Sequence, residues 1–231
     1  MSVFKFKQFS IVQSISAMKV GTDGVLLGSW VNCQKAKKIL DIGTGTGLIS
    51  LMLAQRNNEC NITAVEIDKE TSEEANININ NSKWRDRISI INISINNFTT
   101  TDKFDFIVSN PPYFSKNCSK NKRAIARHTN LLSFQDLIKS TVNLLSSKGI
   151  FAVILPKIAE ATFCKTATEN KLFLIRSCQV KGQKISEFKR VLLEFSFEKS
   201  PLESDSLVIE ESRHIYTNKY IDLCKDFYLN M

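Results

Sequence analysis

Two short motifs in this sequence carry residue types suited to a transfer reaction on a flat amine. The first, Asp41-Ile42-Gly43-Thr44-Gly45-Thr46-Gly47, is a glycine-rich run that begins with a carboxylate. The second, Asn110-Pro111-Pro112-Tyr113, follows later in the chain. A glycine-rich run is typical of a loop that cradles a nucleotide-like cofactor, and an Asn-Pro-Pro-Tyr run is typical of a clamp for a primary amine. Together they predict a cofactor, a reaction type and the kind of atom attacked.

The glycine-rich motif favours S-adenosylmethionine (SAM) over a dinucleotide. Gly43, Gly45 and Gly47 allow a tight turn, and a helix that follows them presents free N–H groups to a ligand. Dinucleotide sites use the spacing G-x-G-x-x-G, whereas this chain has G-x-G-x-G preceded by Asp41. A carboxylate suits the ammonium and sulfonium charges of SAM and repels a pyrophosphate. Glu66, at the end of the next β-rich run, is expected to accept hydrogen bonds from the ribose, and Ile67 to pack on the adenine.

The second motif can hold an exocyclic amine in position for methylation. The side-chain oxygen of Asn110 and the carbonyl of Pro111 can accept the two N–H protons, which localises the nitrogen lone pair. Pro111 and Pro112 fix the backbone and remove competing donors. Tyr113 offers a face on which a purine can stack. Positioning then supplies most of the rate, so no strong general base is required. The alternative is that Asn-Pro-Pro-Tyr is a simple turn that ends a strand. The clamp is favoured because the motif lies in a domain that also carries a cofactor loop.

The elements around the motifs alternate between strands and helices. We expect a strand or hairpin in residues 1–10, and a short helix at 25–31. Further strands are expected at 38–41, 62–65, 88–91, 104–108, 150–155, 173–180 and 190–197, and further helices at 48–55, 69–81, 133–145, 159–170 and 218–229. This pattern predicts a Rossmann-like, doubly wound α/β fold with seven strands, mostly parallel, and an antiparallel hairpin at the end of the sheet. Asp41, Glu66 and Asn110 follow strand ends, so they should converge on one edge of the sheet.

Composition narrows the class of protein. With 231 residues, 43% of them hydrophobic, the chain is expected to form one domain over residues 1–231, in which residues 1–32 extend over the cofactor site. No apolar run is long enough to cross a membrane, and residues 1–10 do not resemble a secretory signal, so a cytoplasmic protein is expected. Six scattered cysteines and two histidines offer little for a metal site, and none is expected.

The charge distribution points to a polyanionic partner. The net charge is +8, from 31 basic and 23 acidic residues. Two stretches hold basic residues and no acid, and the second comes directly after the Asn-Pro-Pro-Tyr motif. Their basic residues are Lys5, Lys7 and Lys19 in the first, and Lys116, Lys120, Lys122, Arg123 and Arg127 in the second. Because the second stretch adjoins the candidate clamp, we interpret it as a nucleic-acid contact rather than a merely solvated loop.

Longer stretches of the chain resemble one family. They are AMKVGTDGVLLG at 17–28, then ILDIGTGTGLISLMLAQR, AVEID, FDFIVSNPPYF, ARHTNLLSF and YTNKYIDLCKDFYL. They are similar to the bacterial tRNA(Val) adenine-N6 methyltransferases, which modify the adenine at position 37, 3′ to the anticodon. The stretches AMKVGTDG and ARH make the match specific, because they are not general features of SAM-binding domains. The resemblance implies SAM as cofactor, tRNA as partner and N6-methyladenosine as product.

The resemblance also assigns roles to single residues. The implied cofactor contacts are Lys19, Thr22, Asp23, Asp41, Gly43, Gly45, Gly47, Glu66, Ile67, Ser94 and Asn110. The implied adenine clamp is Asn110, Pro111, Pro112 and Tyr113, and the implied RNA contacts are Lys116, Lys120, Lys122, Arg123, Arg127 and His128. One departure concerns the SAM adenine. Such enzymes usually carry an Asp after the third strand, whereas this chain has Ser94 there, which can accept a single hydrogen bond.

The same residues are also compatible with other substrates and with a non-catalytic function. The same four clamp residues could present a DNA adenine, a guanine N2 in rRNA or a protein glutamine to the cofactor. A non-catalytic RNA-binding protein on the same scaffold is a further alternative. The absence of a large target-recognition region argues against sequence-specific DNA, and the basic charge argues against an acidic protein substrate. The sequence does not set the oligomeric state, and a monomer is the working expectation.

Overall fold

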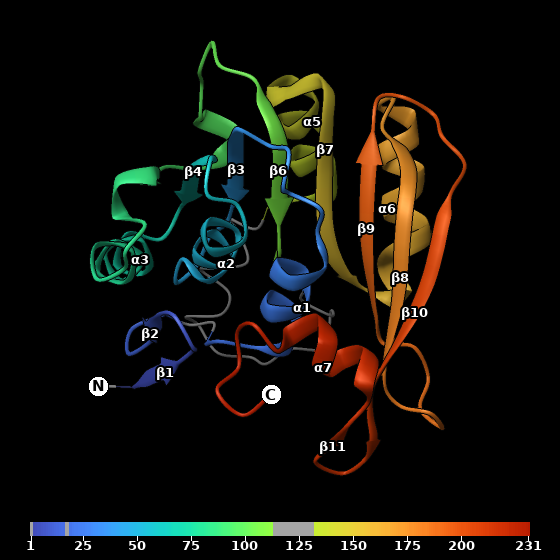
Figure 1. Ribbon diagram of the computed structural model, residues 1–231. Helices are drawn as coiled ribbons and strands as arrows, with labels where there is room; N and C mark the ends of the chain where they lie inside the picture. Colours follow the sequence, from blue (N-terminus) through green and yellow to red (C-terminus); the bar gives the residue numbers. More distant parts are fainter. Residues whose placement is uncertain (1, 17–18, 113–131) are drawn as a thin grey trace, which may run out of the picture.

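The computed structural model describes residues 2–16, 19–112 and 132–231 (Figure 1). A sheet of nine strands lies at its centre, with a separate two-stranded hairpin of β1 (Val3–Lys5) and β2 (Ser10–Val12). The order across the large sheet is β11 (Ile215–Tyr216), β10 (Glu203–Ser212), β8 (Phe173–Gln183), β9 (Arg190–Ser196), β7 (Leu145–Pro156), β6 (Phe104–Ser109), β3 (Lys38–Ile42), β4 (Asn61–Glu66) and β5 (Ile88–Asn92).

Helices cover both faces of this sheet, as a doubly wound fold requires. One face packs against residues of α1 (Thr22–Trp30), α2 (Leu48–Arg56), α3 (Lys69–Asn80) and α7 (Asn218–Cys224). The opposite face packs against α5 (Phe134–Leu144) and α6 (Glu160–Glu169). Short 3-10 turns at Arg85–Arg87, Ile95–Asn97 and Lys157–Ala159 complete the described elements. The Rossmann-like α/β fold expected from the sequence is therefore confirmed.

The expected number of strands was too low. The strands β5, β4, β3, β6 and β7 are parallel, and β9 runs antiparallel between β7 and β8, as the hairpin predicts. However, β10 adds to β8 in parallel and β11 adds to β10, so this hairpin does not end the sheet. β10 was not predicted because it lies near the edge of the sheet. Only Leu207 in its sequence ESDSLVIEES is buried, and acidic residues and serines occupy the exposed positions.

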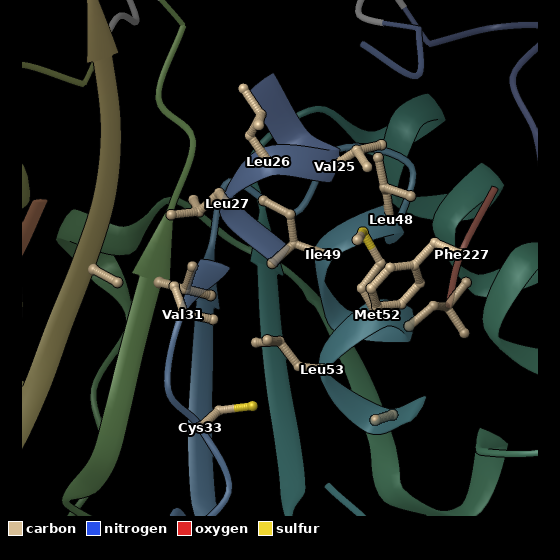
Figure 2. Close-up of a cluster of buried hydrophobic side chains, with 14 of the residues drawn as sticks. Val25, Leu26, Leu27, Val31, Cys33, Leu48, Ile49, Met52, Leu53 and Phe227 are labelled. Atoms are coloured by element: carbon tan, nitrogen blue, oxygen red, sulfur yellow. The ribbon is translucent and has the colours of Figure 1, made fainter. Parts of the chain in front are cut away.

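The packing of α1 on α2 brings the N-terminal region onto the sheet. Figure 2 shows Val25 of α1 next to Leu48 of α2, with Met52 of α2 below them. A Cβ atom placed at Gly28 would lie 2.7 Å from the Met52 Sδ, so only glycine allows this approach of the two helices. The N-terminal helix is thus part of the core rather than a detached extension.

The C-terminal segment closes the same face. α7 begins after Thr217, whose side chain accepts a hydrogen bond from the Tyr220 N–H, and it ends at Cys224 rather than continuing to residue 229 as expected. The chain then turns so that Phe227 is buried, and the Phe227 carbonyl accepts a bond from the Lys7 N–H at 2.8 Å. Among the described residues, no helix is long and apolar enough to cross a membrane.

Candidate active site

The ends of three parallel strands bring the two sequence motifs together. Ile42 at the end of β3 pairs with Ser109 at the end of β6 on one side and with Val65 of β4 on the other. The Ser109 hydroxyl also donates to the Ile42 carbonyl at 2.9 Å, which fixes the two strand ends. Glu66 and Asn110 are the next residues after Val65 and Ser109. The predicted convergence of the motifs on one edge of the sheet is therefore confirmed.

The glycine-rich loop has the backbone that its sequence predicts. Gly43, Gly45 and Gly47 have φ values of 70°, 58° and 82°, which residues with a Cβ rarely adopt. The Val65 carbonyl accepts bonds from the N–H groups of Gly43 and Thr44, at 2.9 and 3.1 Å. A Cβ placed at Gly43 or Gly45 would meet no atom within 4 Å, so the loop is open on the side where a ligand would approach.

Asp41 lies beneath this loop and is fully buried. One carboxylate oxygen, Oδ2, accepts bonds from the hydroxyls of Thr44 and Ser50, both at 2.7 Å. The other oxygen, Oδ1, is buried and has no hydrogen-bond partner among the described residues. Burial, together with the nearby Glu66 charge, raises the pKa of Asp41 to about 6, although the hydrogen bonds from the Thr44 and Ser50 hydroxyls oppose this rise. A cationic ligand group would stabilise the ionised form of this buried acid.

Glu66 connects the end of β4 to the loop. Its Oε2 accepts a bond from the Gly45 N–H, and its Oε1 accepts one from the Asp68 N–H, both at 3.0 Å. Burial raises the pKa of Glu66, and these two backbone N–H groups oppose that rise. An ionised carboxylate offers about four lone-pair positions, so two remain for further donors. The carboxylate is thus oriented beside the glycine loop and can still accept hydroxyl groups of a ligand.

The clamp residues that the structure describes lie beside the N-terminus of α1. Asn110 is half-buried, Pro111 is buried and Pro112 is exposed. A Cβ placed at Gly24 in the first turn of α1 would lie 4.0 Å from the Asn110 Nδ2 and 3.0 Å from the Leu48 Cδ2. Glycine at position 24 thus lets α1 pack closely on Leu48, and it lies within van der Waals reach of the Asn110 amide. Tyr113, the fourth residue of the motif, lies outside the described residues.

The residues expected to cap the cofactor from the N-terminal side lie before α1 and in its first turn. Lys19 and Thr22 are exposed, and Asp23 is half-buried in the first turn of α1. Asp23 forms an ion pair with Arg190, the first residue of β9, with 2.8 Å between its Oδ2 and the Arg190 Nε. Arg190 was not identified from the sequence, since nothing near it in the chain marks a partner so far away.

Two further residues missed by sequence reasoning hold the segment that precedes α1. Glu74 of α3 is 1% exposed and accepts three backbone N–H bonds, from Ser14 at 2.6 Å and from Ile15 and Ser16 at 3.0 Å. Successive N–H groups that converge on one carboxylate form a rigid anion nest. The same segment is therefore tied to α3 by a charged side chain with almost no access to solvent.

Asn78, one turn further along α3, joins this segment to the cofactor loop. Its side-chain Nδ2 donates to the carbonyls of Val12 and Thr46, both at 2.9 Å, and its Oδ1 accepts from the Val12 N–H at 2.8 Å. Thr46 belongs to the glycine-rich motif. Asn78 thus fixes the distance between the N-terminal segment and the loop that would hold the cofactor.

The remaining cofactor candidates lie around the ends of β4 and β5. Ile67 is 51% exposed and follows Glu66 directly. The Ile93 N–H donates to the Glu66 carbonyl at 3.0 Å, which brings the turn containing Ser94 next to the end of β4. The Ser94 side chain is half-buried and makes no capping bond to the turn that it begins. The Ser94 hydroxyl is thus available to accept a hydrogen bond from a ligand, as expected of the residue that replaces the usual Asp.

The expected RNA contacts cannot be placed in the same way. Lys116, Lys120, Lys122, Arg123, Arg127 and His128 all lie outside the described residues. For the cofactor, by contrast, the described residues fit SAM. A buried carboxylate oxygen without a partner suits a cationic group, an oriented carboxylate beside the loop suits a ribose, and the backbone at Gly43 and Gly45 leaves space for a ligand.

Comparison with known proteins gives the family. Residues 5–170 match the methyltransferase small domain. The chain is 49% identical over 230 residues to the tRNA1(Val) (adenine(37)-N6)-methyltransferase of Phocaeicola vulgatus, covering 99% of this chain and 98% of the relative. It is 47% identical over 234 residues to the enzyme of the same name from Flavobacterium psychrophilum, covering 99% of this chain and 100% of the relative.

Solved structures support the fold. A predicted O-methyltransferase from Agrobacterium tumefaciens superposes with a TM-score of 0.71 at 20% identity, covering 89% of this chain and 96% of the other. The glycopeptide N-methyltransferase MtfA, solved with SAM, superposes with a TM-score of 0.58 at 12% identity, covering 80% and 91%. The chain is accordingly a SAM-dependent methyltransferase, and it belongs to the tRNA1(Val) (adenine(37)-N6)-methyltransferase family.

Proposed function

We propose that this methyltransferase transfers a methyl group from SAM to N6 of adenine 37 in tRNA1(Val). The observation that carries the proposal is the near full-length similarity, at 41–49% identity, to eight curated proteins that all bear this activity in their names. The position of Asn110 at the same sheet edge as Asp41 and Glu66 supports it, because a base held at Asn110 would face a cofactor held by the loop.

In the proposed reaction the clamp orients the adenine amine. The Asn110 side-chain oxygen and the Pro111 carbonyl accept the two N6–H protons, and Tyr113 stacks on the base. SAM supplies an electrophilic methyl group on its sulfonium. The N6 lone pair would form the new bond to the methyl carbon as the carbon–sulfur bond breaks, and the sulfur would keep the electron pair. The nitrogen then releases one proton to water, so no residue of the clamp acts as a strong base.

Cofactor binding is assigned to residues on the same edge. Asp41 attracts the cationic end of SAM, Glu66 accepts the ribose hydroxyls, Ser94 contacts the adenine amine and Ile67 packs on the ring. Lys19, Thr22 and Asp23 close over the methionine end. Residues 1–32 then serve as a cover, and the bonds from Glu74 and Asn78 to residues 12–16 support this because they hold the segment beside the glycine loop.

The experiment combines the purified protein, labelled SAM and total tRNA from a strain that lacks the gene, followed by nucleoside mass spectrometry. The expected product is N6-methyladenosine in one tRNA. Transcripts of tRNA1(Val) with adenine or guanine at position 37 then test the site, since guanine has no N6 amine. Label in the guanine transcript, or label only in rRNA, DNA or protein, would overturn the substrate while leaving the methyltransferase activity intact.

A further inference from the structure

The β8–β9 connection forms a basic surface at the same sheet edge as the clamp. We use this name for residues 181–190, KGQKISEFKR, which include the last residues of β8 and the first residue of β9. They hold four basic residues and one acidic residue, Glu187, which gives a net charge of +3. Lys184 and Lys189 are exposed, and neither has an ion-pair partner within the described ranges 2–16, 19–112 and 132–231. Arg190, by contrast, is paired with Asp23. Two lysines in this connection are thus left to interact with something outside it.

The strand register places this connection beyond the strand ends that hold the site. Arg190 at the start of β9 pairs with Pro156 at the end of β7, while Ser109 at the end of β6 pairs with Val153 of β7. β9 runs antiparallel to β7, so the residues that precede Arg190 project past the edge where β6 ends. Figure 1 shows the connection at the lower end of β8 and β9, where β3 and β6 also point.

A chain of contacts links the connection to the clamp itself. Arg190 is bonded to Asp23, and the next residue, Gly24, packs beside the Asn110 amide. Neighbouring strands lie roughly 4.8 Å apart, and two strand spacings separate β6 from β9, so the start of β9 is displaced from β6 by about 10 Å across the sheet and also lies beyond Ser109 along the strand direction. Phosphates next to a base held at Asn110 would be within reach of lysines in this region.

The connection is held in one shape by bonds of its own. The Lys189 N–H donates to the Val180 carbonyl and the Ser186 N–H to the Gln183 carbonyl, both at 3.0 Å. The Lys181 Nζ donates to the Lys184 carbonyl at 2.6 Å and lies 5.1 Å from the centre of the Phe188 ring. Lys184 and Lys189 are therefore presented on a preorganised turn, which lowers the entropy lost when a partner binds.

Two exposed isoleucines flank these lysines. Ile185 in the turn is 94% exposed, and Ile158, which follows β7, is 93% exposed. The Lys157 N–H donates to the Lys189 carbonyl at 3.0 Å, so the two segments are neighbours. Lys157 itself is paired with Glu160. The surface therefore combines free positive charge with apolar side chains, which suits phosphates together with the sugar and base faces of a nucleic acid better than it suits an acidic protein.

We propose that Lys184, Ile185 and Lys189 bind the tRNA strand next to the target adenine. The proposal rests on the proposed function, because it takes tRNA as the substrate. The two lysines neutralise phosphates, and Ile185 packs against a sugar or base. In the sequence, these residues are distinct from the basic stretch at 116–127, which lies outside the described residues.

The test reverses charge with Lys184→Glu and Lys189→Glu in one variant. The control variant carries Lys35→Glu and Lys148→Glu, which are exposed residues near the starts of β3 and β7, at the opposite edge of the sheet. Binding of a tRNA1(Val) transcript is measured at several salt concentrations. We expect the connection variant to bind at least tenfold more weakly and its salt slope to fall by about 1.5, since each phosphate contact contributes roughly 0.7–0.9. The control should change far less, although its net charge is identical.

Two further measurements distinguish the loss of a tRNA contact from damage to the cofactor site. Ile185→Ser should weaken tRNA binding by about fivefold without changing the salt slope, because it removes apolar contact and no charge. The SAM dissociation constant should be the same in all variants, which shows that the site is intact. Equal tRNA binding by the connection and control variants would overturn the proposal. So would sedimentation showing that the wild-type chain self-associates and that the connection variant does not.

Failure of the proposed tRNA-binding surface can be distinguished from failure of the proposed function. If the wild-type protein binds tRNA1(Val) but does not methylate adenine 37, the substrate position is wrong, and the binding measurements still decide whether the connection contacts tRNA. If the wild-type protein methylates adenine 37 and the connection variant keeps its wild-type KM for tRNA, the activity stands and the proposed surface is wrong.

Discussion

The guanidinium of Arg190 lies 2.8 Å from the carboxylate of Asp23, across 167 positions of sequence. This ion pair joins the first turn of α1 to the start of β9, and α1 in turn packs beside Asn110. The N-terminal region is thus fastened at both of its ends: Glu74 and Asn78 hold residues 12–16, and Arg190 holds Asp23. This region is thereby held in place by contacts that are distant in sequence.

Replacing Arg190 by Ala should raise the KM for SAM more than it lowers kcat, because Asp23 loses its position while the clamp is unchanged. The pair is partly exposed, with side chains 38% and 27% accessible, so the stability cost should stay below about 1 kcal/mol. Kinetics at varied SAM concentrations measure the effect. In an Asp23→Asn background, Arg190→Ala should add little. Additive losses would show that Arg190 acts independently of Asp23.

Replacing Glu74 by Gln should loosen the N-terminal cover. Glutamine keeps one acceptor oxygen and adds an N–H₂ group that faces backbone donors, so at least one buried N–H loses its partner at a cost of roughly 1–3 kcal/mol. We expect faster hydrogen exchange at residues 14–16 and weaker SAM binding. Glu73→Gln is the matched control, since Glu73 is exposed on the same helix. Unchanged exchange at residues 14–16 would contradict the tether.

The buried acid Asp41 should make both stability and cofactor binding depend on pH. Its pKa rises from 3.8 to about 6 on folding, so the folded protein binds a proton more tightly than the unfolded chain. The stability that comes from protonation is fully present below pH 3.8 and is lost as the pH rises through 6. At pH 7.5 without SAM, Asp41→Asn should therefore be more stable than the wild type, by on the order of 1–3 kcal/mol.

The same substitution should weaken SAM binding, because the cationic end of the ligand loses its buried counter-charge. Thermal unfolding and calorimetry at pH 5.5 and 7.5 measure both effects. Wild-type SAM affinity should fall at the lower pH, where Asp41 becomes protonated, and the Asn variant should lose this dependence. An Asn variant with wild-type SAM affinity and the same pH profile would show that Asp41 does not face the ligand.

Local sequence signals predicted the parts of the fold that local physics determines. The three positive-φ glycines follow from short-range patterns, as do the ends of β3 and β6, which lie one residue beyond the expected 41 and 108, and the start of a helix at residue 133. The observed Ser133 side chain accepts from the Asp136 N–H at 3.0 Å, as an N-cap residue should. Most strand and helix boundaries were close to those expected, but β7 begins at Leu145 rather than at residue 150, and α7 ends at Cys224 rather than at residue 229.

The parts that the sequence did not predict depend on distant partners. The buried Glu74 and Asn78 bond to residues 58 to 66 positions away, and in isolation they look like polar residues on a weakly amphipathic helix. β10 was not expected as a strand, because only one of its residues is buried. No local pattern encodes which backbone groups a charged side chain will meet, so these features require the structure.

Replacing Asn110 by Ala should remove the clamp's side-chain acceptor and leave the cofactor site in place. Loss of one polar contact made in the transition state costs roughly 2.7–4 kcal/mol, which corresponds to a fall in kcat of about 100- to 1,000-fold. SAM binding by calorimetry should be close to that of the wild type, because Asp41 and Glu66 are untouched. Asn143→Ala, at an exposed position on α5, is the control. Wild-type turnover of the tRNA1(Val) transcript by Asn110→Ala would exclude this residue from the clamp, whereas loss of SAM binding would move its role from the adenine to the cofactor.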